Sequence, residues 1–332
     1  MLHSSVLEIC SEERKFILVL KCVAIFCVVC AHLYPVPSQT GEMNRLVSDI
    51  LNYIGTMGVP VFFIISGFLF AGSKKNCCDF WKKRIKTLFL PWIFCYTVLY
   101  FYVILRKPGT ISYIAMLLGY RSSAYYLSVL IMMYMLFWKN NHITVYALMV
   151  LSLLSIISTG WGWGLAYLND IFGTYFLNPL NWAFFFGMGI LLRKSKKQLV
   201  ELADIGYCLP LLCFLSCAYF FVSHMINESV FYFSRFAILG HIINVPMLFG
   251  IAKMLAYSTN TIFVEIGTYS FPIYLTHQLF AGAIIMITNL CGNPICTGIR
   301  PFFVIGIVLF GIKMLKNTAP VIGVCIGAER DK

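Results

Sequence analysis

The feature that most constrains this chain is a series of apolar runs, each about as long as a helix that crosses a bilayer. A transmembrane helix needs about 20 predominantly apolar residues, and runs of this kind recur along the whole chain. We therefore predict an all-α, polytopic integral membrane protein with about ten transmembrane helices. The predicted spans lie at about 16–34, 51–72, 88–105, 124–138, 142–158, 180–192, 205–223, 232–252, 266–288 and 301–316.

The composition agrees with this class of protein. Apolar residues make up 60% of the chain and charged residues only 11%, whereas about 25% of the residues in a soluble domain are charged. No stretch is both long and polar enough to form a separate soluble domain. We expect a single transmembrane domain over residues 1–332, with membrane lipid as a partner.

The distribution of positive charges predicts the orientation of the spans. With ten spans and a cytoplasmic N-terminus, eighteen of the 25 Lys and Arg residues fall in cytoplasmic segments and five in outer segments. Cytoplasmic loops of membrane proteins carry such an excess of cations, so we predict that both termini are cytoplasmic. The same excess accounts for the net charge of +12, so we expect no nucleic-acid partner.

Two ionisable residues in the first predicted span point to function, because burying such groups in a bilayer is costly. Lys21 and His32 are 11 residues apart. At about 100° per residue they lie within about 20° of each other on one helix face, about 16 Å apart along the axis. A neutral imidazole is a suitable general base, and a buried cation suits a phosphate or a polarised carbonyl. The alternative is a Lys that extends to the interface and an interfacial His.

A third candidate, His277, lies in the ninth predicted span, five residues after Pro272. Pro272 is expected to kink or open that helix, and the freed backbone groups then need partners. His277 either belongs to the site or is a bundle-facing residue that is hydrogen-bonded to a neighbour.

Candidates for substrate contact come from the predicted outer loops. Segment 159–179 is rich in aromatic residues, and Trp161 and Trp163 suit a platform on which a sugar stacks. An aromatic belt at the membrane interface is the favoured alternative for both. Arg121 is a cation of another predicted outer loop and a further candidate. No cysteine pair has the spacing of a zinc site, so we expect no metal.

Residues 21–32, from Lys21 to His32, resemble the first-helix motif of the membrane acyltransferase-3 family, which is an Arg, ten residues and a His. Later segments are similar to that family in the same order, so the resemblance covers nearly the whole chain. These segments are 58–69, 80–86 with Pro91, 125–127, 181–190, 267–277 and 316–327.

The resemblance implies an enzyme that moves an acyl group, commonly acetyl, from acetyl-CoA or another acyl-CoA to hydroxyls of cell-envelope glycans. It thus implies O-acetylation in polysaccharide biosynthesis, a glycan or lipid-linked sugar as acceptor, and polysaccharide-biosynthesis proteins as partners. His32 is then the expected catalytic base, and Lys21 stands where the family has a donor-side arginine. The expected location is the plasma or inner membrane.

The resemblance also implies where the donor binds. Arg84 matches the first arginine of the family's Arg-x-x-Arg loop, and Thr87 occupies the second position. We expect the nucleotide end of coenzyme A on the basic surface of Arg84, Lys83 and Lys86. The pantetheine arm is expected to pass between helices towards the imidazole of the first span.

Two other classes of function stay open at this stage. One is a transporter or flippase for a lipid-linked glycan, and the other is a non-catalytic subunit of a polysaccharide-synthesis complex. The lack of inverted repeats and the scarcity of acids within the spans count against a transporter. Hydrolysis of acetyl-CoA by the purified protein would distinguish the enzyme from both.

Overall fold

The computed structural model describes residues 10–37, 41–73, 76–106, 109, 112–120, 122–139, 141–258 and 260–328, apart from the side chains at 205–207. Within these ranges every regular element is a helix. The predicted substrate contact Arg121 lies outside the described residues.

Long helices make up most of the fold. They are α1 (Ser11–Cys30), α2 (Glu42–Gly55), α3 (Gly58–Ser73), α5 (Leu90–Arg106), α7 (Tyr125–Leu136), α8 (His142–Trp161), α10 (Leu180–Lys194), α12 (Leu209–Met225), α13 (Ala237–Ala256), α15 (Ser270–Cys291) and α17 (Arg300–Thr318). The shorter elements are α4 (Cys77–Arg84), η1 (Ile85–Phe89), α6 (Tyr113–Leu118), η2 (Gly164–Tyr167), α9 (Leu168–Ile171), α11 (Leu199–Leu202), η3 (Ala203–Cys208), α14 (Ile262–Thr268), α16 (Pro294–Gly298) and α18 (Pro320–Cys325).

Every predicted span coincides with one long helix or with two consecutive helices. Among the described residues, six helical stretches are long and apolar enough to cross a membrane, judged by length and composition. The chain is therefore a multi-pass helical membrane protein, whereas ten spans and two cytoplasmic termini stay predictions. The six stretches are Glu42–Ser73, Cys77–Arg106, His142–Trp161, Ala237–Ala256, Ser270–Cys291 and Arg300–Thr318.

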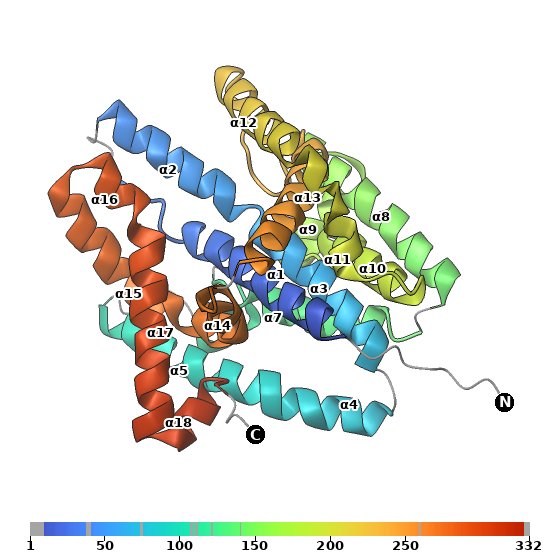
Figure 1. The fold of residues 1–332 in the computed structure, drawn as a ribbon, viewed down its shortest axis with the longest axis horizontal. Helices are drawn as coiled ribbons and strands as arrows, with labels where there is room; N and C mark the ends of the chain where they lie inside the picture. The colour runs from blue at the N-terminus through green and yellow to red at the C-terminus, as the bar shows by residue number, and fades with distance from the viewer. Residues whose placement is uncertain are drawn as a thin grey trace.

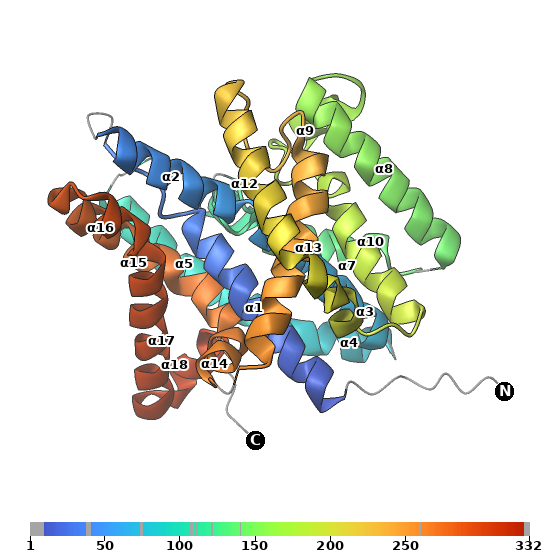
Figure 2. The same ribbon diagram turned by 45° about the horizontal axis from the view of Figure 1, so that its top comes forward.

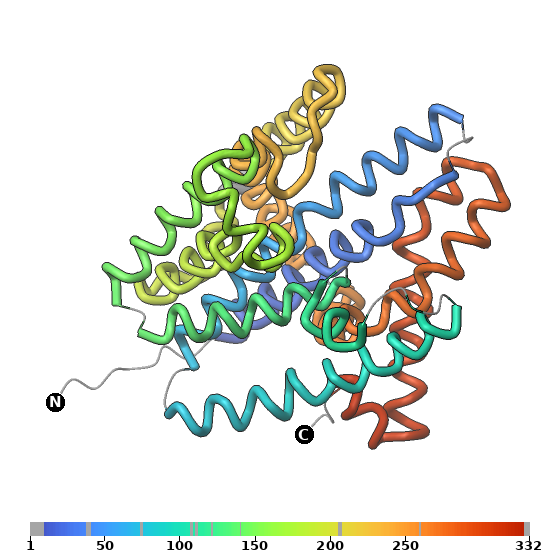
Figure 3. The backbone as a smooth tube through the Cα atoms, turned by 180° about the vertical axis from the view of Figure 1, so that it is seen from behind, coloured from blue at the N-terminus to red at the C-terminus, as the bar shows by residue number. Residues whose placement is uncertain are grey.

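Helix α1 lies at the centre of the bundle (Figure 1). Its side chains from Phe16 to Cys30 are buried on almost every side, as expected for a helix that is apolar all round. It packs against α3, α13, α14, α15 and α17. Seen from behind, α1 lies between α12 on one side and α7 on the other (Figure 3). Most residues of α1 therefore face neighbouring helices.

Glycines allow the closest helix contacts, as is common in membrane bundles. A Cβ on Gly67 of α3 would lie 2.0 Å from the carbonyl oxygen of Phe186 on α10. A Cβ on Gly189 of α10 would lie 2.0 Å from the carbonyl oxygen of Ile64 on α3. The backbones of α3 and α10 thus touch directly.

The ninth predicted span is two helices rather than one. Helix α14 ends at Thr268 and α15 begins at Ser270, so the break lies just before Pro272 and not at it. Pro272 sits in the first turn of α15, where a missing N–H costs no hydrogen bond. The helix direction changes between α14 and α15 (Figure 1). This break sets the start of the helix that carries His277.

One end of the bundle is basic. The start of α1, helix α4 and the end of α17 lie together at the lower end of the molecule in Figure 2. These segments carry Lys15, Arg84 and Lys313. We call this the basic end, and the end of α1 that precedes His32 lies at the opposite end.

Candidate functional site

His32 lies in a tight turn that extends α1. Helix α1 ends at Cys30, and the amides of Ala31, His32 and Leu33 donate to the carbonyls of Cys27, Val29 and Cys30 at 3.1 Å. The last two are three-residue bonds, which tighten the final turn of a helix. The chain therefore keeps its helical path through His32. Lys21 and His32 are then about 16 Å apart along this path, from the helical rise.

The rings of His32 and His277 are neighbours. Their centroids are 5.0 Å apart and their planes meet at 44°. His277 is completely buried in α15. The α14–α15 break and the central position of α1 thus bring together two imidazoles that are 245 residues apart in sequence.

Hydrogen bonds define which nitrogen of His277 carries the proton. Nδ1 lies 2.8 Å from the carbonyl oxygen of Tyr274 and 3.2 Å from that of Ile273. Carbonyl oxygens only accept, so in the neutral ring Nδ1 is the donor and Nε2 holds a lone pair. Nε2 is buried and has no hydrogen-bond partner among the described residues. A buried acceptor without a partner is costly, and in native structures it needs a functional or structural explanation.

His32 lines two adjoining cavities, of about 420 Å³ and 310 Å³. His32, Ser122 and Gln278 belong to both. The larger cavity is rich in aromatic rings, hydroxyls and amides, whereas the smaller is mostly apolar. The polar and aromatic residues of the larger one are Tyr34, Asn52, Thr56, Ser122, Ser123, Tyr125, Thr174, Tyr175, Phe176, Phe231, Tyr232, Tyr274 and Gln278. Such walls suit a polyhydroxylated ligand, because rings stack and hydroxyls and amides orient it.

Internal hydrogen bonds hold the walls of the larger cavity in place. The hydroxyl of Tyr232 donates to the carbonyl of Gly55 at 2.8 Å. The hydroxyls of Tyr96 and Ser123 are 2.6 Å apart, and the Tyr274 hydroxyl donates to the Ser123 carbonyl. The rings beside His32 are thus held in fixed orientations before any ligand binds.

Arg300 ties together the two helices that carry the imidazoles. It is fully buried at the start of α17. Its Nη1 donates to the carbonyls of Leu33, at 3.0 Å, and Pro35, at 2.8 Å. Its Nε donates to Thr288 Oγ1 at 2.7 Å, and its Nη2 to Asn289 Oδ1 at 2.5 Å. Since Leu33 follows His32 and α15 carries His277, this guanidinium fixes one helix end relative to the other helix.

Two cations converge nearer the basic end. Lys21 is half-buried, and the positive charge of Arg84 on α4 is near enough to repel the Lys21 ammonium. The Arg84 guanidinium lies over the rings of Phe80 and Tyr134, at 5.0 Å and 5.3 Å from their centroids. Within the described part of the chain, no carboxylate pairs with Lys21. Among the described residues, therefore, no carboxylate neutralises the positive charge of Lys21.

The other predicted donor residues lie on the same segment. Lys83 and Lys86 are exposed on α4 and η1, where they extend the positive surface of Arg84. The Thr87 hydroxyl donates to the Lys83 carbonyl at 3.0 Å. Thr87 therefore offers no positive charge and its hydroxyl is engaged with the helix backbone.

The structure separates the cation pair from the imidazole pair. Neither cavity at His32 includes Lys21. Ala24, Ile25 and Val28, which lie between them on α1, are buried by neighbouring helices. A ligand that touches both pairs must therefore displace packed side chains along α1.

Trp161 and Trp163 lie away from both imidazole cavities. They are exposed near the end of α8, where the Arg235 guanidinium lies over the Trp161 ring at 5.5 Å from its centroid. The aromatic residues that do surround the cavity include Tyr175 and Tyr232, which the sequence did not single out. Tyr175 does fall in the aromatic segment 159–179, so composition was a partial signal for it.

These features define a multi-pass helical membrane protein with an imidazole site beside a polar cavity and a cation pair nearer the basic end. A family model described as an acyltransferase domain matches residues 14–314, so the chain belongs to the acyltransferase-3 family. The predicted family is thereby confirmed, and the protein is a membrane acyltransferase. No curated protein and no solved structure matches the chain.

Proposed function

We propose that the protein is a membrane O-acyltransferase that moves an acyl group, acetyl by preference, from cytosolic acyl-CoA to a hydroxyl of a cell-surface or lipid-linked glycan. The observation that carries this proposal is the position of His32. Its ring lines a polar, aromatic cavity and contacts the ring of His277, whose Nε2 has no hydrogen-bond partner among the described residues. A base beside a cavity for a hydroxyl compound is what acyl transfer to an alcohol requires.

The proposed reaction is a direct transfer. A sugar hydroxyl in the larger cavity gives its proton to His32 while its oxygen attacks the thioester carbonyl. The carbon–sulfur bond then breaks, the new ester forms, and the imidazolium returns the proton to the leaving thiolate. The products are the O-acylated glycan and free coenzyme A, and His32 ends in its starting form.

His277 is proposed to position His32. Because its proton is held by the Tyr274 carbonyl, Nε2 can only accept. An acceptor next to the His32 ring favours the His32 tautomer that points an N–H towards it, directly or through water. The second nitrogen of His32 is then left as the base. A substitution at His277 that cannot accept a hydrogen bond removes this preference.

The donor is proposed to approach from the basic end. Arg84, Lys83 and Lys86 would hold the phosphates of coenzyme A, since cations and phosphates pair strongly. Lys21 lies between this surface and His32 on α1 and would contact the arm of the donor. The buried side chains along α1 must separate for the thioester to reach His32, so donor binding and helix motion are coupled.

The acceptor is proposed to enter from the opposite end. Tyr175 and Tyr232 offer rings, and Asn52 and Gln278 offer amides, to one sugar unit in the cavity. Trp161 and Trp163 would contact only more distant units of a longer glycan, and Arg121 stays a predicted substrate contact. Placement in the plasma or inner membrane and association with polysaccharide-biosynthesis proteins are consistent with such an acceptor.

The test is the acyl content of the surface glycans. Cells that lack the gene should lose one O-acyl group from a glycan, and the wild-type gene should restore it. His32→Ala, expressed in the membrane at the same level, should not restore it. Full restoration by His32→Ala would contradict the proposal, as would unchanged acylation in cells that lack the gene.

A further inference from the structure

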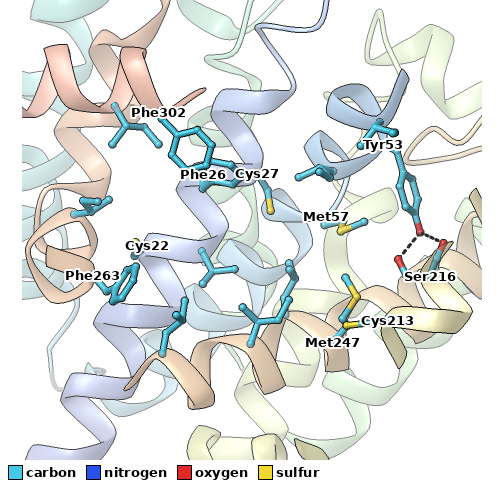
Figure 4. A pocket seen from close by; sticks show the side chains of 18 of the residues that line it. Cys22, Phe26, Cys27, Tyr53, Met57, Cys213, Ser216, Met247, Phe263 and Phe302 are labelled. Carbon is cyan, nitrogen blue, oxygen red and sulfur yellow. Dashed lines mark hydrogen bonds between the residues drawn. The ribbon is translucent and has the colours of Figure 1, made fainter. Parts of the chain in front are cut away.

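A third cavity lies apart from both pairs described above. It encloses about 820 Å³ between α1, α2, α12, α13, α14 and α17. Figure 4 shows its side chains, which are nearly all apolar: Cys27 of α1 points towards Met57, Phe26 lies beside Phe302, and Cys22 lies beside Phe263. We call it the apolar cavity. Its volume falls within the usual range of ligand sites, about 300–1,000 Å³.

Helix geometry places the apolar cavity on the far side of α1 from the imidazole site. Cys22, Phe26 and Cys27 lie about 100–240° around α1 from Lys21, whereas His32 lies within about 20° of it. Helix α2 separates the two spaces in the same way. Residues 50, 53 and 54 of α2, with Met57 just after it, line the apolar cavity. Residues 52 and 55 of α2, with Thr56 after it and Val59 of α3, line the cavity at His32. The apolar cavity is therefore an independent site.

The walls of the apolar cavity leave no polar group for a ligand. No charged residue lines it. The Tyr53 and Ser216 hydroxyls lie 3.0 Å apart, and each donates to Asn244 Oδ1, at 3.0 Å and 2.8 Å. The four thiols that line the cavity behave as small apolar groups. A polar ligand would lose its hydrogen bonds to water here and gain none, so the chemistry selects a hydrocarbon.

Water is an equally poor occupant. A buried water needs about two to four polar partners, and the lining of this cavity is nearly all apolar. Its walls include membrane-spanning stretches, among them α13 and α17. At the depth of those helices the abundant apolar molecules are the chains of bilayer lipids.

We propose that the apolar cavity binds one hydrocarbon chain of a bilayer phospholipid. The lining follows α17 from Phe302 to Leu309, and Lys313 lies one turn further along that helix, with its side chain half exposed and paired with Glu265. A chain along α17 places its phosphate beside that cation. At the other end, Arg300 is buried and engaged in four hydrogen bonds. The charges therefore place the headgroup at the basic end.

A pair of glycines on α17 allows a matched test. Gly306 lines the apolar cavity, and a Cβ there meets nothing within 4 Å. Gly311 lies on the same helix, also meets nothing within 4 Å, and is not part of the lining. Gly306→Phe fills the cavity with a ring, whereas Gly311→Phe adds the same ring to the same helix elsewhere.

The experiment uses the full chain in nanodiscs that contain a phosphatidylglycerol with a diazirine at the end of one chain. After illumination, cross-links are mapped by mass spectrometry. The wild type and Gly311→Phe should be labelled at lining residues such as Met57 and Met247. In Gly306→Phe the labelling of Met57 and Met247 should be at least five-fold weaker than in the wild type. The labelling of surface residues such as Phe310, which is 65% exposed, should stay the same.

Two results would overturn the proposal. One is equal labelling of Met57 and Met247 in Gly306→Phe and Gly311→Phe. The other is wild-type labelling confined to lipid-facing residues such as Phe310 and Leu290, which decides the question even if Gly306→Phe does not fold. A matched nanodisc with a diacylglycerol probe, which carries the same diazirine chain without a phosphate, tests the headgroup, and labelling of the lining as strong as with phosphatidylglycerol would refute the assigned role of Lys313.

Discussion

Replacing Arg300 tests whether the imidazole site depends on one buried guanidinium. Arg300 makes four hydrogen bonds to α15 and to the residues just after His32. Lys keeps the charge, but its single ammonium group cannot bond both to α15 and to the residues after His32, as the planar guanidinium does. Arg300→Lys should therefore free the end of α1 from α15, while the helices themselves remain.

The magnitude follows from the contacts. At about 0.6 kcal/mol for each hydrogen bond between helices in a membrane, the four bonds are worth about 2.4 kcal/mol together. Replacement by Lys should remove about half of this stabilisation. The effect on rate should be larger, because a displacement of about 1 Å at a reacting group can lower the rate about 100-fold. We expect kcat to fall about 10- to 100-fold, with KM for acetyl-CoA within about two-fold, because the donor cations lie nearer the other end of the bundle.

The assay is release of coenzyme A thiol by purified protein in nanodiscs, together with the thermal midpoint in the same lipid. The matched control is Arg235→Lys, because Arg235 is an exposed guanidinium whose ion pair with Glu228 lies at the surface. The control should keep its rate. A kcat for Arg300→Lys within two-fold of the wild type would refute the positioning role. So would a loss of rate that only follows the loss of folded protein.

Three further predictions concern the donor cation, the second imidazole and the helix contacts. Lys21→Arg should keep or raise acyl transfer, and Lys21→Met should raise KM for acetyl-CoA at least five-fold in thiol-release assays; an unchanged KM in Lys21→Met would argue against a donor-side role. His277→Phe should lower kcat about 10- to 100-fold, whereas His277→Gln, which can still accept a hydrogen bond, should recover part of the rate; equal rates for the two would contradict the positioning of His32. Gly67→Ala should destabilise the bundle by about 1–3 kcal/mol, because its Cβ would lie 2.0 Å from the Phe186 carbonyl, and a thermal midpoint equal to that of the wild type would refute the close contact of α3 and α10.

The helices and the family could be predicted from the sequence because both depend on local patterns. Each apolar run coincides with helix in the structure, and the motif that starts at Lys21 and ends at His32 belongs to a matched family domain. Bilayer thickness determines the length of such runs, so length alone is a strong signal. The break before Pro272 was placed a few residues too late, because proline is tolerated in the first turn of a helix.

The walls of the site could not be predicted in the same way. Arg300 reads as an ordinary cation of an outer loop, yet it is fully buried and bonded to carbonyls that are 265 and 267 residues away in sequence. Tyr232 lines the cavity, and its hydroxyl bonds to the carbonyl of Gly55, which is 177 residues away in sequence. Such contacts arise from tertiary packing around α1, and neither periodicity nor charge pattern encodes them. The apolar cavity was missed for the same reason, since each of its walls is an unremarkable apolar helix face.

The central claim is that His32 is the base of an acyl transfer. The most direct measurement is the transfer of radiolabelled acetyl from acetyl-CoA to glycan by purified protein in nanodiscs, with wild type, His32→Ala and the exposed control His142→Ala compared at equal folded content. A general base typically contributes about 100- to 10,000-fold to a rate. The account predicts a loss of that size for His32→Ala and an unchanged rate for His142→Ala. Transfer by His32→Ala at a rate within two-fold of the wild type would contradict it.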